Sequence, residues 1–361
     1  MNRLFSILLP ALLLPGFAPA ETKKDFTSIV DIVGKREVEE RGGIGITIGV
    51  AHGDETVYLK GFGKADLEND VPASENGVYR IGSITKMFTA AAILLLLEEG
   101  KLTLDDPLQK HLPEYPDMAK GVTLRHLLNH TSGIFSFTDI KNRWSDIRLD
   151  LKHEEILEKF QDVPLAFKPG EKFKYSNSGY YLLGMVIEKV SGRKYHEFLE
   201  EQIFQKIDLK ATSYDRHLKI IPHRVRGYAK WGDQIVNAQF VSMKQPFAAG
   251  AIASTAGDLI QWQRALVAGS LLKPETYQLM ITPAKLAKGK SAPYALGCFV
   301  GKLDETAVIR HGGAIPGFVS ELAYFPGENL TVVVLTNATR NSPRSIADAI
   351  ARTWIAKKKE K

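Results

Sequence analysis

The chain has 361 residues, of which 44% are hydrophobic and 24% charged, enough to bury the core of one large domain or of two closely joined ones. The formal net charge is +6, but the last five residues, four lysines and one glutamate, supply +3 of it. No basic patch interleaves with aromatic residues, so nucleic-acid binding is not expected. The single cysteine, Cys298, excludes an internal disulfide, and its apolar surroundings predict a buried, inert thiol.

The first twenty residues have the three-part pattern of a cleaved secretory signal. One arginine precedes an apolar run over residues 4–17, and the small-residue ending Ala-Pro-Ala follows. Two prolines interrupt the run, which is shorter than the roughly 20 residues of a membrane span. The pattern predicts a signal peptide over residues 1–20 and export to the periplasm or the medium. A transmembrane anchor is the alternative, although we expect no stable membrane span.

Strand patterns gather at the two ends of the chain. Residues 44–50 alternate in a way typical of a strand with one apolar face, and a turn leads to a second strand over residues 56–62. Four more strands are expected near the C-terminus, over residues 294–300, 306–310, 320–325 and 330–336, and a helix over residues 343–354 follows them.

The middle of the chain is mainly helical with long loops. The clearest helices are expected over residues 84–99, 123–129, 180–190 and 257–266. Strands at both ends predict an α+β fold in which N- and C-terminal strands build one antiparallel sheet, flanked by helices, with an inserted mainly helical region. We expect one catalytic domain: a sheet part of residues 21–100 plus 290–361, and an inserted part of residues 101–289.

The motif Ser-x-x-Lys occurs three times, and its surroundings separate the copies. Ser191 and Ser270 lie in sequences typical of a helix end and a turn. Ser83 and Lys86 instead precede a wholly apolar run, residues 87–97, which is too long for a strand. Ser83 therefore stands at the start of a buried helix, and Lys86 projects beside it. An N-cap serine and a solvated lysine are the alternative. However, a lysine there opposes the helix dipole and is costly to bury, which favours chemistry.

Two further elements carry polar groups that suit a catalytic site. Tyr175 and Asn177 form the only Tyr-x-Asn in the chain, and side chains two apart in an extended segment point the same way. A phenol and a carboxamide so placed suit proton transfer and substrate holding, with packing and helix capping as the alternative. His311 opens a His-Gly-Gly sequence after a strand, where glycines let a substrate approach the sheet edge.

The order Ser-x-x-Lys, Tyr-x-Asn, His-x-Gly resembles that of the penicillin-binding proteins and serine β-lactamases. The resemblance is closest to class C β-lactamases and the related D-Ala-D-Ala carboxypeptidases, D-aminopeptidases and esterases. Residues 124–133 (LRHLLNHTSG) and 169–179 (PGEKFKYSNSG) also look like family segments, so the resemblance covers nearly the whole chain after the signal. It implies a β-lactamase/transpeptidase-like fold.

The resemblance also implies catalytic roles. Ser83 would attack a carbonyl group and become an acyl-enzyme, while Lys86 and Tyr175 would manage its proton. Lys86 is either a neutral base or a cation that lowers the pKa of Tyr175, which then acts as the base. We favour the second, because a lysine neutral near pH 7 needs a pKa far below its ordinary value, and a helix terminus alone does not supply that shift.

Substrate contacts follow from the same resemblance. Backbone N–H groups of Ser83 and Ala314 would hold the oxyanion. His311 stands where many relatives carry a lysine, and its imidazole, mostly neutral at pH 7, weakens the case for carboxylate recognition. The expected substrate-binding residues are Asn177, His311, Gly312, Gly313 and Ala314.

Other chemistries find little support in the sequence. His126 and His130 have metal-ligand spacing, but no third ligand is nearby, so capping or structural roles are favoured. No Gly-x-Ser-x-Gly occurs, which disfavours an α/β-hydrolase lipase, and no nucleotide-binding fingerprint occurs. We therefore expect no metal and no cofactor.

The leading hypothesis is an exported serine hydrolase that forms an acyl-enzyme on a small-molecule or peptide substrate: D-alanyl or other D-amino-acid peptides, possibly of the cell wall, or β-lactams. A promiscuous esterase of the same fold and a non-catalytic wall-binding or regulatory relative are the alternatives. We expect loops over residues 135–151 and 228–246 to set specificity. The sequence predicts no oligomeric state.

Overall fold

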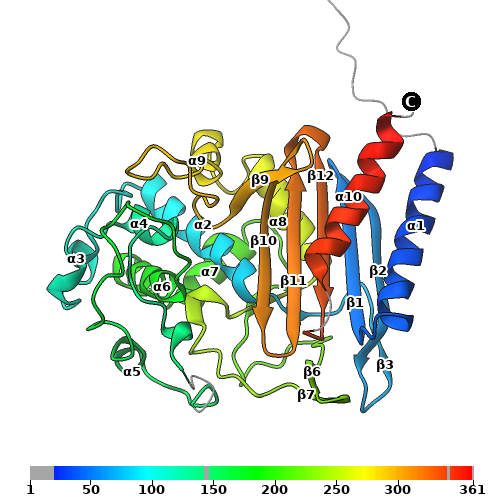
Figure 1. Ribbon diagram of the computed structural model, residues 1–361, viewed down its shortest axis with the longest axis horizontal. Coiled ribbons are helices and arrows are strands. Elements are labelled where there is room, and N and C mark those ends of the chain that lie inside the picture. The colour runs from blue at the N-terminus through cyan, green and yellow to red at the C-terminus, as the bar shows by residue number, and fades with distance from the viewer. Residues whose placement is uncertain (1–19, 142–145, 340–341, 360–361) are drawn as a thin grey trace, which may run out of the picture.

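A seven-stranded antiparallel sheet lies at the centre of the computed structural model, which describes residues 20–141, 146–339 and 342–359 (Figure 1). The strand order is β3-β2-β1-β12-β11-β10-β9. Its strands are β1 (Gly45–His52), β2 (Glu55–Asp66), β3 (Val71–Pro72), β9 (Phe299–Leu303), β10 (Thr306–Ile315), β11 (Phe318–Phe325) and β12 (Leu330–Thr336). Because β1 pairs directly with β12, both ends of the chain build one sheet, which confirms the predicted fold class. The predicted signal peptide, apart from Ala20, lies outside the described residues.

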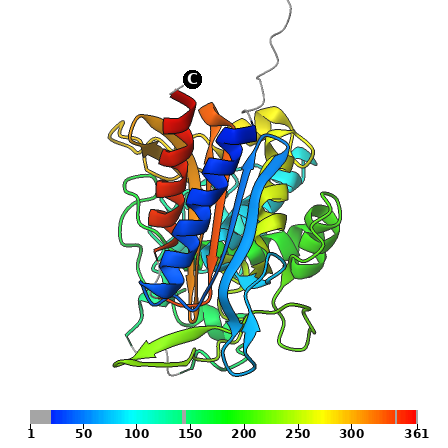
Figure 2. The ribbon, with the colours of Figure 1, turned by 90° about the vertical axis from the view of Figure 1, so that its right-hand side faces the viewer.

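Two terminal helices cover one face of this sheet. α1 (Ala20–Glu39) and α10 (Pro343–Lys359) lie side by side across it (Figure 2). Phe26 of α1 and Ile350 of α10 are buried in a cluster with alternate sheet residues such as Ile48 and Val332. α1 was not among the predicted helices. Its packing on the sheet also explains why β1 is buried along both faces. The sequence had predicted only one apolar face for this strand.

Helices of the middle region cover the opposite face. α8 (Ala256–Val267) packs on β1 and β12, and α2 (Thr85–Glu98) lies beyond it, contacting α6 (Asn177–Ser191). α2 is apolar all round because other elements enclose it on every side. Phe88 of α2 stacks on Trp262 of α8 at 4.0 Å between ring centres. Thus the helix that follows Ser83 is fixed in the core, as predicted.

The middle region also contains short helices, of which the one over residues 124–128 matches the helix expected over residues 123–129, and two small sheets that were not predicted. The helices are α3 (Leu108–His111), α4 (Leu124–Leu128), α5 (His153–Leu157), α7 (Tyr195–Leu199) and α9 (Pro274–Met280). The strands are β4 (Tyr79–Arg80), β5 (Ser213–Tyr214) and β8 (Ile252–Ser254) in one sheet, and β6 (Tyr228–Trp231) and β7 (Gln234–Asn237) in the other. Among the described residues, no helix has both the length and the apolar character needed to cross a bilayer.

The strand expected over residues 294–300 is wrong. The chain turns at Gly297, whose φ is +91°, and β9 begins only at Phe299. A Cβ on Gly297 would lie 2.6 Å from that of Ala90, so this turn presses directly against α2 and bends away from the sheet. Cys298 within it is buried, as expected, and burial raises the pKa of its thiol to about 12.

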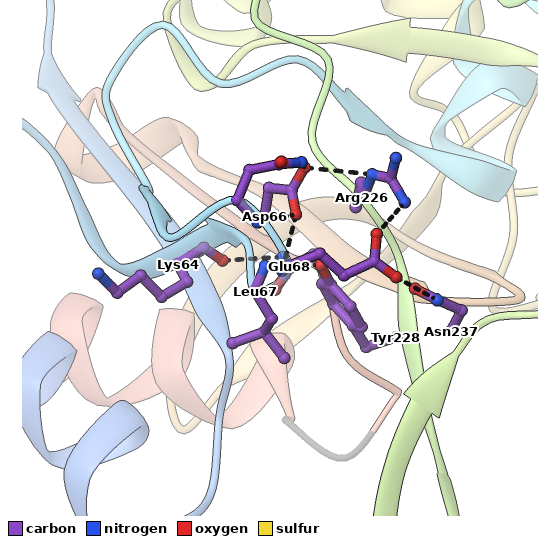
Figure 3. Close-up of polar contacts among 9 residues, drawn as sticks. Lys64, Asp66, Leu67, Glu68, Arg226, Tyr228 and Asn237 are labelled. Atoms are coloured by element: carbon purple, nitrogen blue, oxygen red, sulfur yellow. Dashed lines mark hydrogen bonds and ion pairs between the residues drawn. The ribbon is translucent and has the colours of Figure 1, made fainter.

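A polar clamp ties the turn after β2 to the base of the β6–β7 hairpin (Figure 3). Glu68 accepts hydrogen bonds from Arg226 at 2.6 Å and from Asn237 at 2.7 Å. The Tyr228 hydroxyl accepts the Leu67 N–H at 2.7 Å. The chain that leaves β7 continues into residues 241–250, so the clamp fixes the start of a segment that borders the candidate site.

Candidate active site

Ser83 lies in the 3₁₀ turn Gly82–Ile84, which runs directly into α2. This turn presses against β10. A Cβ on Gly313 would lie 1.9 Å from the Ile81 carbonyl oxygen, and a Cβ on Gly82 would lie 2.8 Å from a backbone nitrogen of β10. Gly82 also has a φ of +51°, a conformation that favours glycine. The two glycines therefore permit the close approach that sets Ser83 beside β10.

Lys86 is fully buried in the first turn of α2 and makes three hydrogen bonds. Its Nζ lies 3.1 Å from Ser83 Oγ, 2.8 Å from Asn177 Oδ1 and 2.7 Å from the Ala249 carbonyl oxygen. The predicted pairing of Ser83 with Lys86 is therefore present. The sequence analysis did not identify Ala249, because nothing marks a backbone carbonyl 163 residues away as a partner of this amine.

The surroundings of Lys86 favour its neutral form. Burial lowers the pKa of this amine well below that of a free lysine. A neutral amine has two N–H groups and one lone pair, and the oxygens of Asn177 and Ala249 can only accept. An amine that donates to both directs its lone pair at the Ser83 hydroxyl. This arrangement suits a general base and runs against the expectation that Lys86 stays charged.

Tyr175 reaches the same hydroxyl from the segment before α6. The Ser83 side chain is close enough to the phenol to affect its pKa, and Lys86 Nζ lies 4.9 Å from the ring centre. Burial raises the pKa of the Tyr175 phenol well above its ordinary value, and the nearby Ser83 side chain lowers it by less. The phenol is therefore held protonated. This direction also runs against the favoured expectation of a phenolate base.

Asn177 is the first residue of α6, and its side chain lines the site. Its Nδ2 donates to Thr138 Oγ1 at 2.8 Å, so its Oδ1 faces Lys86. Its backbone N–H donates to Ser136 Oγ at 3.1 Å. Ser176, not Asn177, caps the helix by accepting the N–H of Gly179. The sequence analysis missed Thr138 and Ser136, although they fall in a loop expected to set specificity.

His311 lies outside the cleft lining. Its side chain is 1% exposed, and both ring nitrogens have partners. Its Nδ1–H donates to the Gly312 carbonyl at 2.7 Å, so its Nε2 accepts the Tyr294 hydroxyl at 2.8 Å. Burial is the main cause that lowers the pKa of His311 to about 3. The expected direct contact between His311 and a substrate therefore has no free ring nitrogen to make it.

A cleft of about 670 Å³ opens over Ser83. Both loops expected to set specificity contribute to its lining, and of the strand residues expected to bind substrate, Ala314 lines it. Three charged residues also line it: Asp146 and Lys159, which pair with each other, and Lys141. Apolar side chains dominate the remainder of the surface, including Phe137, Ile140, Ile147, Val241, Pro246 and Ile315.

The histidine pair of residues 124–133 is divided between two roles. His126 accepts the Thr123 N–H at 3.2 Å and caps α4. His130 is buried against the ring of Tyr175 at 4.1 Å between centres. Across the described ranges, no three His, Cys, Asp or Glu side chains gather in a way that could hold a metal ion.

Comparisons with known proteins agree with this geometry. The sequence profile of the family described as Beta-lactamase matches residues 33–355. Penicillin-binding protein 4* of Bacillus subtilis (strain 168) is 28% identical over 310 residues, which cover 81% of this chain and 67% of that protein. The octameric penicillin-binding protein homologue from Pyrococcus abyssi is 28% identical, with a TM-score of 0.79 over 92% of this chain and 77% of that chain.

A third similarity concerns the fold alone. The D-amino acid amidase from Ochrobactrum anthropi SV3, solved with L-phenylalanine, superposes with a TM-score of 0.81. The alignment covers 92% of this chain and 99% of the amidase, at 24% identity. The seven-stranded sheet and its flanking helices are therefore shared with an enzyme whose name places it among the amidases.

Proposed function

The chain belongs to the Beta-lactamase family, and we propose that it is a serine hydrolase that forms an acyl-enzyme through Ser83. One observation carries the proposal. The Lys86 amine lies 3.1 Å from the Ser83 hydroxyl, the Tyr175 phenol lies near the same group, and Ser83 opens into a cleft. A nucleophile with a base in hydrogen-bond reach, itself oriented by a third group, is the signature of an activated serine.

In the proposed acylation, Ser83 Oγ forms a bond with the substrate carbonyl carbon while its proton moves to the neutral Lys86 amine. The bond to the leaving group then breaks, and the leaving nitrogen or oxygen takes up the proton from Lys86 through the Tyr175 hydroxyl. Backbone N–H groups of Ser83 and Ala314 stabilise the negative oxygen. Asn177 holds the Lys86 amine in place and orients the substrate.

Hydrolysis completes the proposed cycle. A water molecule attacks the ester carbonyl carbon, and its proton passes to the Lys86 amine. The acid leaves, and the proton returns to Ser83 Oγ. No step in this sequence uses charge on His311, which agrees with its buried, neutral ring.

We propose as substrates D-alanyl or other D-amino-acid peptides, or β-lactams. The penicillin-binding relative and the penicillin-binding protein homologue support this class. A promiscuous esterase is the second candidate. The mostly apolar lining of the cleft favours it, as does the buried His311, whose neutral ring offers no positive charge to a substrate carboxylate. A non-catalytic wall-binding or regulatory protein is a third possibility.

We also propose that the chain is exported to the periplasm or the medium. Its support is the apolar run over residues 4–17 and the Ala-Pro-Ala that follows. The test is expression of the full chain in a bacterial host, fractionation of the cells and sequencing of the mature N-terminus. A mature protein that begins near Glu21 outside the cytoplasm is expected; an intact chain in the cytoplasm contradicts the proposal.

The experiment that tests the function is intact mass spectrometry after incubation with a fluorophosphonate and, separately, with a fluorescent penicillin. We expect one adduct at Ser83, absent from Ser83→Ala and present in Ser270→Ala, which removes the serine of another Ser-x-x-Lys copy. Labelling by both reagents supports penicillin recognition, and labelling by the fluorophosphonate alone supports an esterase. No labelling by either supports the non-catalytic protein. Hydrolysis of D-Ala-D-Ala peptides, nitrocefin and short acyl esters then ranks the substrates.

A further inference from the structure

One residue, His130, holds the backbone on both sides of Tyr175. Its carbonyl oxygen accepts the N–H of Lys174 at 2.9 Å, and its ring Nδ1 accepts the N–H of Ser176 at 3.1 Å. Its ring also packs on that of Tyr175, with centres 4.1 Å apart. The residue before Tyr175, the residue after it and the phenol ring itself are therefore all in contact with the same side chain or its backbone.

His130 occupies this place at a conformational cost. Its φ is +59°, in the left-handed region that residues other than glycine seldom adopt. It is 1% exposed and is enclosed by aromatic rings, including those of Tyr294 at 4.6 Å and Tyr180 at 5.1 Å. A strained backbone at a buried polar residue persists where its surroundings hold it in that position, and such strain gathers at functional sites.

The hydrogen bonds of His130 also fix where its proton lies. Nδ1 accepts from the Ser176 N–H, so the neutral ring carries its proton on Nε2. That nitrogen is buried and has no hydrogen-bond partner within the described part of the chain. Burial is the main cause that lowers the pKa of His130 well below its ordinary value. A buried N–H without a partner costs free energy, so stability alone does not explain a histidine here.

We propose that His130 is a positioning residue for the reaction: it sets the Tyr175 phenol against Ser83 and Lys86. This inference rests on the proposed function. Tyr175 lies in an extended segment that enters α6 two residues later, so its position depends on the bonds to the flanking amides. A shift of about 1 Å in a catalytic group can cost about 100-fold in rate. The hydrogen bond from the Ser176 N–H to His130 Nδ1 needs an acceptor on residue 130, and an apolar ring at that position cannot provide one.

Two substitutions separate the contacts of His130. His130→Phe keeps a ring against Tyr175 and removes the buried N–H, but it loses the acceptor for the Ser176 amide. His130→Asn keeps an acceptor at the position of Nδ1 and tolerates the left-handed backbone, but it loses the ring. We expect His130→Phe to lower kcat for a short acyl ester by about tenfold or more with KM nearly unchanged, and His130→Asn to retain most of the activity.

A double-substitution cycle shows whether the effect passes through Tyr175. In a Tyr175→Phe background, His130→Phe should lower the rate by less than about threefold, because the group that it positions is already absent. His126→Phe is the matched control, since His126 caps α4 and has no contact with Tyr175 in the structure. The same four proteins can be compared by the rate at which a fluorophosphonate modifies Ser83, a measurement that does not depend on the choice of substrate.

The outcomes separate this inference from the proposed function. If the wild-type chain hydrolyses none of the proposed substrates and reacts with neither the fluorophosphonate nor the fluorescent penicillin, the proposed function is wrong and the positioning role is wrong with it. If the wild-type chain is active and Tyr175→Phe is impaired, but His130→Phe matches the wild type or lowers the rate equally in both backgrounds, the inference alone is wrong. Should His130→Phe fail to fold, His130→Asn provides the test: an Asn variant as slow as Tyr175→Phe overturns the stated role of the Ser176 bond.

Discussion

Lys86 of α2 and Asn177 of α6 are joined by a 2.8 Å hydrogen bond between residues 91 positions apart in the chain. The Asn177 side-chain amide cannot flip without breaking the hydrogen bond that its Nδ2 donates to the Thr138 hydroxyl. Its oxygen is therefore fixed toward the Lys86 amine, and the contact between the two helices determines where the amine can donate. The protonation of Lys86 is thus set by the packing of the fold and not by the Ser-x-x-Lys sequence alone.

The first prediction concerns stability and pH. In the unfolded chain Lys86 binds a proton below its ordinary pKa of 10.5, whereas in the fold burial lowers that pKa well below this value. Because the unfolded state binds more protons, the contribution of Lys86 to stability rises as the pH increases toward its ordinary pKa of 10.5. Urea unfolding at pH 7, 8 and 9 should therefore show the wild type gaining stability relative to Lys86→Met. Parallel curves would mean that the lysine is charged in the fold.

The second prediction separates the two possible bases. Tyr175→Phe removes the proton relay, so kcat should fall by about 10²-fold or more. The acidic limb of the kcat/KM profile should keep its position, because a neutral Lys86 and not a phenolate sets it. The measurement is ester hydrolysis from pH 5 to 9 in both proteins. If the acidic limb disappears in the variant, the base is the Tyr175 phenolate and not Lys86.

The third prediction tests the contact between the nucleophile turn and β10. Gly313→Ala places a Cβ 1.9 Å from the Ile81 carbonyl oxygen, so the turn that carries Ser83 must move. We expect unfolding to become easier by about 2 kcal/mol or more, and Ser83 labelling to slow at least tenfold. Gly301→Ala in the neighbouring strand β9 is the control, because nothing lies within 4 Å of its added Cβ. Equal behaviour of the two variants would contradict the close approach.

The fourth prediction concerns Thr138. Thr138→Val keeps the shape of the side chain but removes the acceptor of the Asn177 amide. One hydrogen bond of ordinary strength is worth about 1 kcal/mol, so kcat/KM should fall about fivefold. Thr138→Ser retains the hydroxyl and should remain within about twofold of the wild type. A valine variant as active as the serine variant would show that the Asn177 amide is held without Thr138.

Local sequence patterns predicted much of the framework. The apolar run after Ser83 predicted α2, and its exclusion of polar residues predicted full burial. Clustering of strand patterns at the two ends predicted that one sheet joins them, as the pairing of β1 with β12 shows. The spacing of Ser83 and Lys86 predicted their contact because three residues in a helical turn place side chains on one side.

The features that the sequence did not predict depend on contacts between residues far apart in the chain. The place of the first helix, α1, on the sheet follows from the tertiary packing of residues such as Phe26 and Val30. The 294–300 strand was wrong because Gly297 turns the chain against α2, a contact that no local pattern contains. The protonation of Lys86 depends on Ala249 and on burial, and the isolation of His311 depends on Tyr294. Each is set by atoms far away in the sequence.

The last prediction uses the buried ring of His311. An unfolded histidine binds a proton below about pH 6.5, whereas burial lowers the pKa of His311 in the fold to about 3. The unfolded state therefore binds more protons between these values, and the fold loses stability as pH falls. This loss amounts to about 2 kcal/mol between pH 7 and pH 5. His311→Gln has no titrating group, so in urea unfolding at pH 7, 6 and 5 the wild type should lose about 2 kcal/mol more than this variant. His217→Gln, at an exposed position, is the control and should follow the wild type. If His311→Gln also follows the wild type, the ring is protonated in the fold, and a charged group near Lys86 must be added to the proposed mechanism.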